Sequence, residues 1–349
     1  MAVFYSENVL QIRDIYNRLQ DEMSVKIFEN RLLYSLTGDM KYIDSIAPPL
    51  RDESISYYSQ FHNIVVYGAG HMGMYFALLC GDSVKISAFC DKDKTKHRTA
   101  RHGYPVISLE ELKENYISST IAISITDDKA VSEIKNELQS MGFNENQILS
   151  LKDRLDDTFP QKQYFDKDIL NLKDGEIFVD GGCFDFGTCS DFVKHCGGSY
   201  RKIIAFEPSP NQYSACVNNS KNYRDISIYP YALWNKNTEL NFDNHDGSNA
   251  SVSCDSSDSI SVKAVMLDDI LNSEKATFIK LDVEGAELNA LMGAEQTIRN
   301  YHPKLAICVY HKPEDIWEIP AYILSLHDDY KFYLRHYSFN MDETVLYAV

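Results

Sequence analysis

The sequence predicts an α/β protein with two Rossmann-like, doubly wound domains, and three observations support this fold class. From residue 61 onward, short apolar runs of strand length alternate with longer runs of helical periodicity. Two of the apolar runs end in glycine-rich turns, as strands do where an open parallel sheet borders a crevice. The last two runs are joined by a short turn, which predicts an antiparallel hairpin at the end of an otherwise parallel sheet.

Composition and charge narrow the class of protein. The chain has 349 residues, which suggests two domains, and 44% of them are hydrophobic, as in a globular protein. It has 34 Lys and Arg against 51 Asp and Glu, a formal net charge of −17. An acidic surface repels phosphate backbones and anionic lipid, so we expect no nucleic-acid partner. No apolar run is long enough to span a bilayer, so we expect no membrane span.

The cysteines and the N-terminus indicate a cytoplasmic protein. Eight cysteines are present, none of them in a Cys-x-x-Cys pair, and most lie in apolar runs. We therefore expect buried, reduced thiols, as is usual in the cytosol. Residues 1–30 are charged and mixed, without the apolar segment of an export signal.

Three parts of the chain are predicted. Residues 1–60 form an N-terminal helical segment, with apolar residues at helical spacing, which we interpret as a cap or a dimerisation arm, so a homodimer is an open alternative. Residues 61–152 form a Rossmann-like nucleotide-binding domain. Residues 160–349 form the third part, with a polar insertion at 235–259 that predicts loops and a small hairpin. The strands expected are 63–67, 85–90, 120–125, 147–151, 176–179, 202–206, 226–229, 277–281, 304–310, 331–336 and 344–349.

A glycine turn and an acid follow two strands of the third part. Asp180, Gly181 and Gly182 end the first strand, and a helix is expected to begin near Gly187. Glycines permit a sharp turn and close approach of a ligand, and the free N–H groups of a helix start point into the crevice. Glu207 ends the second strand, where a carboxylate can accept both hydroxyl hydrogens of a ribose. A structural turn and a solvated acid are the alternative interpretations.

Three acids crowd the end of a later strand, in the segment Phe278-Ile-Lys-Leu-Asp-Val-Glu-Gly-Ala-Glu287. We expect Asp282 and Glu284 beside the crevice, where they could orient a substrate or bind a divalent cation such as Mg²⁺ through their oxygens. Glu287 also has a structural interpretation, because helix N-termini favour negative charge.

Several segments together resemble the FkbM family of S-adenosylmethionine-dependent methyltransferases, and their order and spacing carry the resemblance. One departure is Gly182-Cys183-Phe184-Asp185, where the family more often has Gly-Ala-Asn; this changes the side chains near the methionine part of the cofactor. The segments are 178–188, Phe206-Glu-Pro-Ser209, Leu267-Asp-Asp269, Leu281-Asp-Val-Glu-Gly-Ala-Glu287, Tyr310-His-Lys-Pro-Glu-Asp315, Ile319-Pro320 and Leu334-Arg-His-Tyr-Ser338.

The resemblance implies a seven-stranded class I methyltransferase fold, S-adenosylmethionine as cofactor, and O-methylation of a hydroxyl on a sugar, a glycan precursor or a related small polar metabolite. By position, Asp180, Gly181 and Gly182 would line the methionine and ribose of the cofactor, and Glu207 would hold the ribose hydroxyls. The remaining cofactor-binding positions expected from the resemblance are Phe184, Ser209, Ala232 and Leu233.

Methyl transfer from a sulfonium requires alignment of the acceptor and removal of its proton. An alcohol is a poor nucleophile at neutral pH, so a general base is useful. His311, which follows the fifth strand, is the first candidate. Asp282 is the alternative, either as the base or as a ligand of a metal that acidifies the hydroxyl. Glu284 is grouped with them as catalytic, and Arg335 and His336 are expected to bind substrate, with a structural role as the alternative for each histidine.

A second glycine turn lies in the N-terminal domain. Gly68, Gly70 and Gly73 form a G-x-G-x-x-G pattern between a strand and a helix, and Asp91 follows the next strand, where it could accept ribose hydroxyls. Residues 103–112 resemble small Rossmann-type domains of sugar-modifying proteins, which bind nucleotides or nucleotide sugars. A second nucleotide site, for NAD or a nucleotide sugar, is one hypothesis, and a purely structural domain is the other.

The leading prediction is a methyltransferase whose N-terminal domain positions a nucleotide-linked substrate. The main alternative is an oxidoreductase or epimerase that uses NAD or a nucleotide sugar on the N-terminal domain, although no partner for hydride transfer is evident. A binding protein without catalytic activity is the third interpretation.

Overall fold

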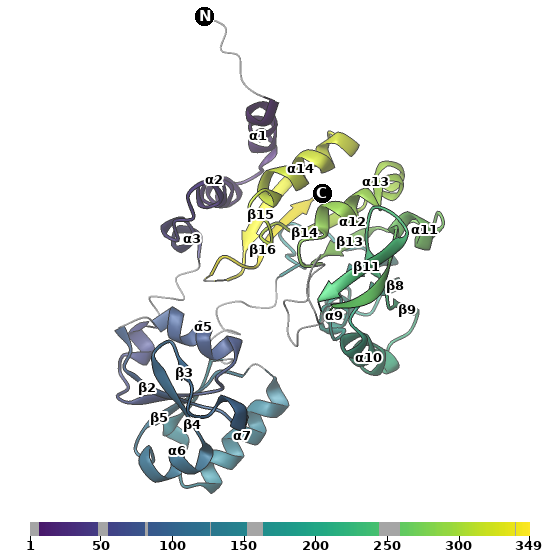
Figure 1. The fold of residues 1–349 in the computed structure, drawn as a ribbon. Coiled ribbons are helices and arrows are strands. Elements are labelled where there is room, and N and C mark those ends of the chain that lie inside the picture. Colours follow the sequence, from purple (N-terminus) through teal and green to yellow (C-terminus); the bar gives the residue numbers. More distant parts are fainter. Residues whose placement is uncertain are drawn as a thin grey trace, which may run out of the picture. The chain divides into compact units, whose positions relative to one another are not determined.

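The structure is a computed structural model that describes residues 7–47, 55–80, 83–125, 127–151, 163–243, 259–338 and 340–349. The chain forms two compact units (Figure 1): one combines Met1–Ala47 with Gln161–Val349, and the other is Pro48–Pro160. Each unit contains a mostly parallel sheet, so the predicted α/β class is confirmed. Among the helices that lie in the described part of the chain, none combines the length and the apolar character that a membrane crossing needs.

The smaller unit is built on one six-stranded sheet with the order β3-β4-β2-β1-β5-β6. All neighbouring strands in it run parallel except β3 and β4. Every residue of β1 is buried, as expected for a central strand covered on both faces. Its elements are β1 (Ile64–Tyr67), α5 (His71–Cys80), β2 (Ile86–Cys90), β3 (Ala100–Arg101), β4 (Tyr104–Ile107), α6 (Leu109–Asn115), β5 (Thr120–Ile123), α7 (Asp128–Ser140) and β6 (Ile148–Ser150).

The larger unit is built on a seven-stranded sheet with the order β15-β16-β14-β13-β7-β8-β9. Its strands are β7 (Glu176–Gly181), β8 (Tyr200–Phe206), β9 (Ile226–Tyr229), β13 (Phe278–Leu281), β14 (Lys304–Cys308), β15 (Phe332–His336) and β16 (Thr344–Ala348). Its helices are α1 (Glu7–Arg18), α2 (Glu22–Thr37), α3 (Lys41–Ile46), α9 (Gly187–His195), α10 (Pro210–Asn219), α11 (Leu267–Leu271), α12 (Glu287–Met292), α13 (Glu295–Tyr301) and α14 (Asp315–Leu326).

The direction of the strands brings the predicted site residues to one edge of this sheet. Only β16 runs against the other six strands, and it lies between β14 and β15. The predicted terminal hairpin is therefore present, and the carboxyl ends of β7, β8, β13, β14 and β15 lie at the same edge. In the register, Gly181 at the end of β7 lies beside Phe206 on one side and Leu281 on the other.

Both faces of the sheet are buried, which explains the continuous apolar runs in the sequence. Along β7, Ile177 and Val179 pack into one core cluster and Phe178 packs into the other. Along β13, Ile279 packs into the first of these clusters and Phe278 into the second. Helices therefore have to cover both faces, and only the ends of the strands remain available for a site.

The polar insertion forms part of a second, smaller sheet. This sheet contains β10 (Ala232–Leu233), β11 (Thr238–Asp243) and β12 (Ser259–Val265) in the order β10-β12-β11. β11 lies within the predicted insertion and pairs antiparallel with β12, which lies almost wholly after it, so the small hairpin expected within residues 235–259 stays a prediction. Residues 244–258 of the predicted insertion lie outside the described residues.

The N-terminal helices belong to the larger unit rather than to a separate segment of residues 1–60. α2 packs on β15 and α1 packs on α14 (Figure 1). Gln20 donates its backbone N–H to the carbonyl of Phe332 at 3.0 Å, and Ser24 Oγ accepts the N–H of Leu334 at 2.9 Å. An edge strand leaves backbone groups unpaired, and Gln20 and Ser24 satisfy two of them on β15. This role depends on a contact across the chain and has no signal in the local periodicity.

A buried ion pair joins β7 to β13. Lys280 Nζ lies 3.0 Å from Asp180 Oδ1, and the two side chains are 2% and 0% exposed. The same ammonium donates to the carbonyls of Gly182 at 2.8 Å and Gly181 at 3.3 Å. Burial alone would lower the pKa of Lys280, but the carboxylates of Asp180 and Asp282 raise it above its usual value. The pair therefore carries charge and ties the glycine turn to the neighbouring strand.

We expect Lys280→Met to lower the free energy of unfolding by about 3–5 kcal/mol, because it leaves the carboxylate of Asp180 buried without its partner. Urea unfolding followed by circular dichroism measures the change. The matched control is Lys202→Met, which removes a more exposed pair with Glu274 at 2.6 Å. Its effect should stay below about 1 kcal/mol. Equal losses in the two variants would contradict the role assigned to Lys280.

Candidate active site

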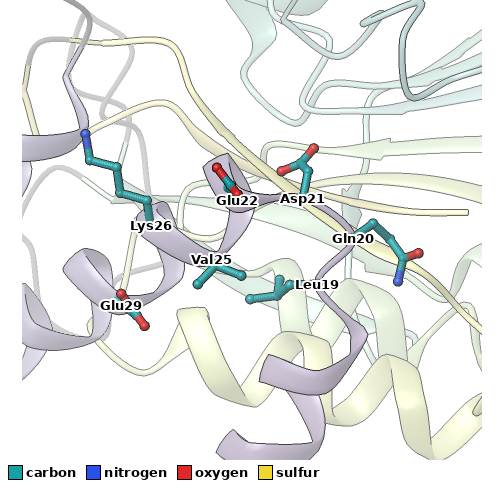
Figure 2. Close-up of a pocket in the computed structure, with 7 residues that line it drawn as sticks. All are labelled: Leu19, Gln20, Asp21, Glu22, Val25, Lys26 and Glu29. Carbon is teal, nitrogen blue, oxygen red and sulfur yellow. The ribbon is translucent and has the colours of Figure 1, made fainter.

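An open pocket of about 430 Å³ lies beside the start of α2 (Figure 2), and the predicted substrate residue Arg335 contacts its lining through Asp21 at 2.7 Å. Apolar and charged side chains mix in its lining, and none of the predicted site residues is among them. The lining residues are Leu19, Gln20, Asp21, Glu22, Val25, Lys26 and Glu29.

The glycine turn after β7 is required by the packing of the chain on itself. A Cβ on Gly182 would lie 1.8 Å from the carbonyl oxygen of Asp282, and the residue has a φ of +77°. A Cβ on Gly181 would lie 2.7 Å from Leu281 Cδ2 and 2.9 Å from Leu233 Cδ1. Any other residue at position 182 would push the end of β13 away from the turn, whereas at position 181 the ends of the two leucine side chains would have to shift. The glycines thus hold the ends of three strands close together.

Glu207 lies at the end of β8, next to this turn. Its Oε2 accepts the backbone N–H of Phe184 at 3.0 Å, and its Oε1 accepts that of Ser209 at 2.8 Å. Burial raises the pKa of Glu207 to about 7, although the two backbone donors oppose the shift. The carboxylate is therefore oriented by the backbone on both sides and changes its charge near neutral pH.

The other predicted cofactor residues lie around the same turn. Leu233, buried in β10, is the side chain that closes against Gly181. Ala232 is buried beside it, and Ser209 is the N-cap of α10. Phe184 has a φ of +53° and is 43% exposed, so its ring lies at the surface of the turn. Phe184 and Ser209 contact Glu207 directly, and Leu233 lies against the neighbouring Gly181.

Asp180 occupies a different place from the one expected. Its carboxylate is fully buried, and Cys189 Sγ donates to Oδ2 at 3.2 Å while Lys280 holds Oδ1. Burial raises the pKa of Asp180, and the ammonium of Lys280 offsets part of that rise. The sequence predicts that Asp180 lines the cofactor. Its carboxylate instead lies beneath the glycine turn, where it pairs with Lys280. Lys280 is not among the site residues predicted from the sequence. One feature does point to it: it is a lysine within an otherwise apolar strand, and lysine is rarely buried without a partner.

Acidic side chains and one imidazole gather at the ends of β13 and β14. His311 Nε2 lies 3.3 Å from Glu284 Oε2 and 3.7 Å from Asp282 Oδ1. On the other side of the ring, Nδ1 lies 3.0 Å from Oε1 of the fully buried Glu287. The side chains of Asp282 and Glu284 are 24% and 32% exposed, so solvent reaches both. The structure thus brings the three predicted catalytic residues together.

These carboxylates change what His311 can do. Burial alone would lower the pKa of His311, but Glu284 and Glu287 raise it to about 11. At neutral pH the ring is therefore an imidazolium, which has no free lone pair to accept a proton. This arrangement favours a different role for His311 from the predicted general base, because three carboxylates stabilise the protonated form of the ring.

Two tyrosines that the sequence did not single out orient Asp282. Tyr164 donates its hydroxyl to Oδ2 at 2.8 Å, and Tyr310 lies 3.4 Å from Oδ1. Burial alone would raise the pKa of Asp282, but Lys280 and His311 lower it below its usual value. Asp282 is therefore an ionised, oriented carboxylate. Tyr164 lies before β7 with no motif around it, so only the tertiary contact identifies it.

Arg335 and His336 lie on β15, where Arg335 contacts α2 and its N-cap, while His336 has a partner at Nδ1 and a buried Nε2 without a hydrogen bond to any described residue. Arg335 donates to Asp21 at 2.7 Å and to Ser24 at 3.2 Å, which ties β15 to α2. His336 is 8% exposed, its Nδ1 lies 2.8 Å from Thr344 Oγ1, and burial lowers its pKa to about 3. The contacts of Arg335 favour a structural role over the substrate role that the sequence predicts, and His336 is a neutral, buried ring.

Asp282, Glu284 and His311 lie close enough together for their ligand atoms to be compared with a divalent-cation site. Each residue offers one ligand atom, and the three atoms lie within 4.8 Å of one another. Mg²⁺ prefers oxygen ligands alone, and the imidazole of His311 is here a protonated partner of the carboxylates. Asp282 and Glu284 offer one oxygen each, no other observation supports the predicted Mg²⁺, and no step of the chemistry is assigned to it.

The second glycine turn lies in the smaller unit, and its backbone packs closely against itself and against Asp91. Gly68 has a φ of +108°, and a Cβ on Gly73 would lie 2.0 Å from the carbonyl oxygen of Gly68. Asp91 Oδ2 accepts the backbone N–H of Ala69 at 2.8 Å and the ammonium of Lys96 at 3.0 Å. The predicted residues are thus adjacent, with Gly70 in the turn between them, and Asp91 is oriented by Ala69 and Lys96.

Comparisons with known proteins separate the two parts of the chain. Residues 178–341 match the family described as Methyltransferase FkbM domain. Residues 60–149 match a different family, described as C2185-like, N-terminal. This second match does not confirm the predicted Rossmann-like, nucleotide-sugar-binding domain. No curated protein matches the chain.

The likeness to one solved structure extends over most of the chain. The crystal structure of methyltransferase FkbM from Methylobacillus flagellatus KT shares 18% identity, covers 94% of this chain and 99% of its own, and has a TM-score of 0.51. UDP-D-quinovosamine 4-dehydrogenase from Vibrio fischeri shares 24% identity over 26% of this chain and 77% of its own, at a TM-score of 0.22. Aeropyrum pernix fibrillarin with bound S-adenosyl-L-methionine shares 13% identity, covers 54% of this chain and 74% of its own, and has a TM-score of 0.35.

The first of these structures supports the fold, and the other two carry no argument at their TM-scores. The dehydrogenase therefore lends no weight to the oxidoreductase alternative. The family match covers the glycine turn, Glu207 and the cluster around Asp282 in one continuous stretch. The larger unit of this chain accordingly contains a methyltransferase domain of the FkbM type, at residues 178–341.

Proposed function

We propose that this chain transfers the methyl group of S-adenosylmethionine to a hydroxyl of a sugar, a glycan precursor or a related small polar metabolite. The observation that carries the proposal is Glu207, held by two backbone donors at the end of β8, beside the glycine turn. The match of residues 178–341 to a methyltransferase domain supports the reaction class.

Glu207 can hold a ribose in spite of its two existing hydrogen bonds. Each carboxylate oxygen can accept more than one hydrogen bond, so Oε1 and Oε2 each keep capacity for one ribose hydroxyl. The N–H groups of Phe184 and Ser209 fix the direction in which the remaining lone pairs point. Such an oriented acceptor loses little freedom when the ligand binds.

When bound, S-adenosylmethionine supplies a methyl group that its sulfonium has already activated. The protein has to align the acceptor hydroxyl and take its proton. Asp282 is suited to this task, because it is ionised, partly exposed and oriented by the hydroxyl of Tyr164 at 2.8 Å. His311, as a cation, holds Glu284 and Asp282 in place and is assigned a positioning role.

The charge of the cluster supports a hydroxyl-bearing acceptor without negative charge. The exposed oxygens of Asp282 and Glu284 can accept hydrogen bonds from hydroxyls, and they repel carboxylates and phosphates. A sugar hydroxyl fits this environment, and a phosphate group close to the reacting hydroxyl does not.

Replacing Glu207 tests the cofactor site. We expect Glu207→Gln to weaken the binding of S-adenosylhomocysteine by about 1–3 kcal/mol, the value of hydrogen bonds to a charged group. Isothermal titration calorimetry measures the affinity. Glu274→Gln, a change at a more exposed acid of the same unit, should bind as the unchanged protein does. Unchanged affinity in a folded Glu207→Gln variant would refute the ribose role.

The pKa of Glu207 predicts how cofactor affinity depends on pH. Above its pKa of about 7, the unliganded carboxylate is ionised and accepts the ribose hydroxyls. Below that value the group is protonated, and binding has to displace the proton, so affinity should fall by up to about tenfold per pH unit. Titrations at several pH values on either side of the pKa measure this. Glu207→Gln should lose this dependence, and an equal slope in the variant would assign the effect to another group.

Replacing Asp282 tests the base. We expect Asp282→Asn to reduce kcat by about 10²–10⁴-fold, because the amide cannot accept the proton. The assay offers neutral and phosphorylated sugars with S-adenosylmethionine, and mass spectrometry detects the methyl ether. Asp269→Asn, on α11, should retain activity. A methylated product on nitrogen or carbon would refute O-methylation, and full activity of Asp282→Asn would exclude it as the base.

A further inference from the structure

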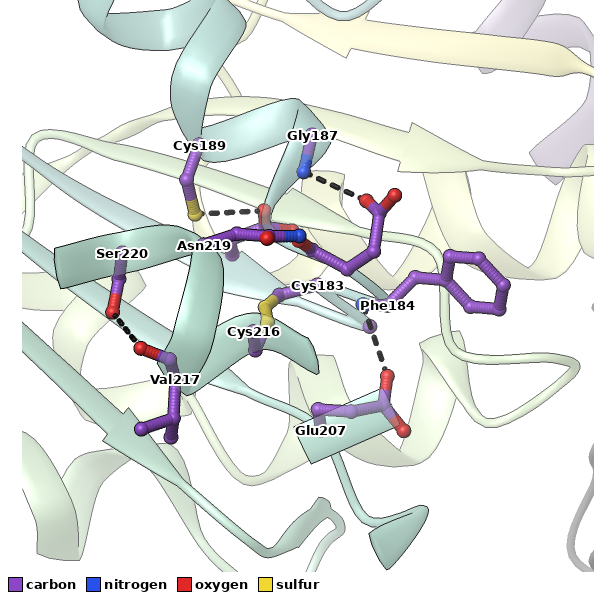
Figure 3. The surroundings of a disulfide bond; sticks show 12 residues. Cys183, Phe184, Gly187, Cys189, Glu207, Cys216, Val217, Asn219 and Ser220 are labelled. Atoms are coloured by element: carbon purple, nitrogen blue, oxygen red, sulfur yellow. Dashed lines mark hydrogen bonds between the residues drawn. A yellow bond between two sulfur atoms is a disulfide. The ribbon is translucent and has the colours of Figure 1, made fainter. Parts of the chain in front are cut away.

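A disulfide bond crosses the cofactor turn. Cys183, the residue after Gly182, is bonded to Cys216 on α10, 33 residues later in the chain (Figure 3). Both residues are buried, with exposed fractions of 1% and 0%. The expectation that all cysteines are reduced thiols is therefore wrong for these two. Cys254, also part of that expectation, lies outside the described residues.

The bond joins the two segments that orient Glu207. Phe184, which follows Cys183, donates to Oε2, and Ser209, which caps the start of α10, donates to Oε1. Figure 3 shows the disulfide and the hydrogen bond of Phe184 to Glu207 side by side. A relative shift of the turn and α10 would therefore separate the two donors and misdirect the carboxylate.

Other contacts between these segments are weaker than the covalent bond. Asn219, at the end of α10, donates its side-chain amide to the carbonyl of Asp185 at 2.8 Å. One exposed hydrogen bond contributes little to holding two segments in register, because water competes for both groups. The disulfide is the contact whose presence depends on the redox state of the solution.

We propose that the Cys183–Cys216 bond is a reversible redox site that sets the affinity of the cofactor site, an inference that rests on the proposed function. A dithiol reductant supplies two electrons and two protons. The sulfur–sulfur bond breaks, Cys183 and Cys216 become thiols, and the reductant becomes a disulfide. A small-molecule disulfide such as oxidised glutathione reverses the reaction by exchange and is itself reduced to two thiols.

Cys189 lies close to the disulfide bond but does not exchange with it. Cys189 Sγ lies within 4.8 Å of Cys183 Sγ, near enough for a mixed disulfide after a small movement. However, this thiol donates to Asp180 at 3.2 Å, and burial together with that carboxylate raises the pKa of Cys189 well above its usual value. Only a thiolate attacks a disulfide, so internal exchange with Cys189 is suppressed.

The coupling has to act in both directions. If reduction weakens cofactor binding, then bound cofactor must favour the oxidised form by the same factor. We expect reduction to weaken the binding of S-adenosylhomocysteine about tenfold, the effect of one misdirected hydrogen bond to a charged group. A saturating concentration of S-adenosylhomocysteine should then shift the midpoint potential of the Cys183–Cys216 couple by about 30 mV towards more negative values.

The experiment compares the full-length protein in three forms: oxidised, reduced with dithiothreitol, and reoxidised with glutathione disulfide. Mass spectrometry of peptides prepared without reductant identifies the bond, and calorimetry measures S-adenosylhomocysteine affinity. Cys216→Ser should bind like the reduced protein under all conditions. The matched control is Cys196→Ser, at a free, partly buried cysteine of the same unit, which should respond like the unchanged protein. Thermal melting confirms that every form is folded.

Tenfold weaker binding on reduction, restored by reoxidation and absent from Cys216→Ser, supports the proposal. It is overturned if peptides linking Cys183 and Cys216 are not found in the oxidised protein. It is also overturned if the oxidised and reduced forms bind equally, since the methyltransferase function would then stand without this control. If no form binds S-adenosylhomocysteine, the proposed function itself fails. If Cys196→Ser loses the response as well, the effect belongs to another thiol.

Discussion

The buried pair of Lys280 and Asp180 is the constraint on which the rest of the site depends. A lysine in the middle of a sheet is stable only when a carboxylate and hydrogen-bond acceptors surround it, and here the acceptors are the carbonyls of the glycine turn. The pair therefore determines how the backbone leaves β7. Because the N–H of Phe184 follows two residues later, the direction of the Glu207 carboxylate depends on the same charge.

The protonation states of His311 and of the acids around it are the second determinant of the chemistry of the site. Histidine is the usual candidate for a base because its ordinary pKa lies near neutrality. With Glu284 and Glu287 on its two sides, His311 is a lasting cation instead. The same positive charge, together with Lys280, keeps Asp282 ionised. An aspartate thereby becomes available for the role that the residue types alone would assign to the histidine.

The N-terminal helices show how distant segments complete a fold. The edge strand β15 would otherwise present open backbone groups, and α2 meets it through Ser24 and the pair of Asp21 with Arg335. A residue that appears suited to substrate binding is thus used to attach the first helices to the sheet. The larger unit is consequently built from both ends of the chain, with the smaller unit inserted between them.

The sequence by itself determined the alternation of strands and helices, the seven strand positions of the larger unit, and the neighbourhood of Gly181, Glu207 and Asp282. Local periodicity and strand direction suffice for these, because parallel strands end at one edge. Only the tertiary structure decided that Asp180 lies beneath the turn with Lys280, that His311 is a cation, and that Cys183 bonds to Cys216. Burial, charge state and disulfide pairing depend on neighbours far away in the chain, which no local pattern encodes.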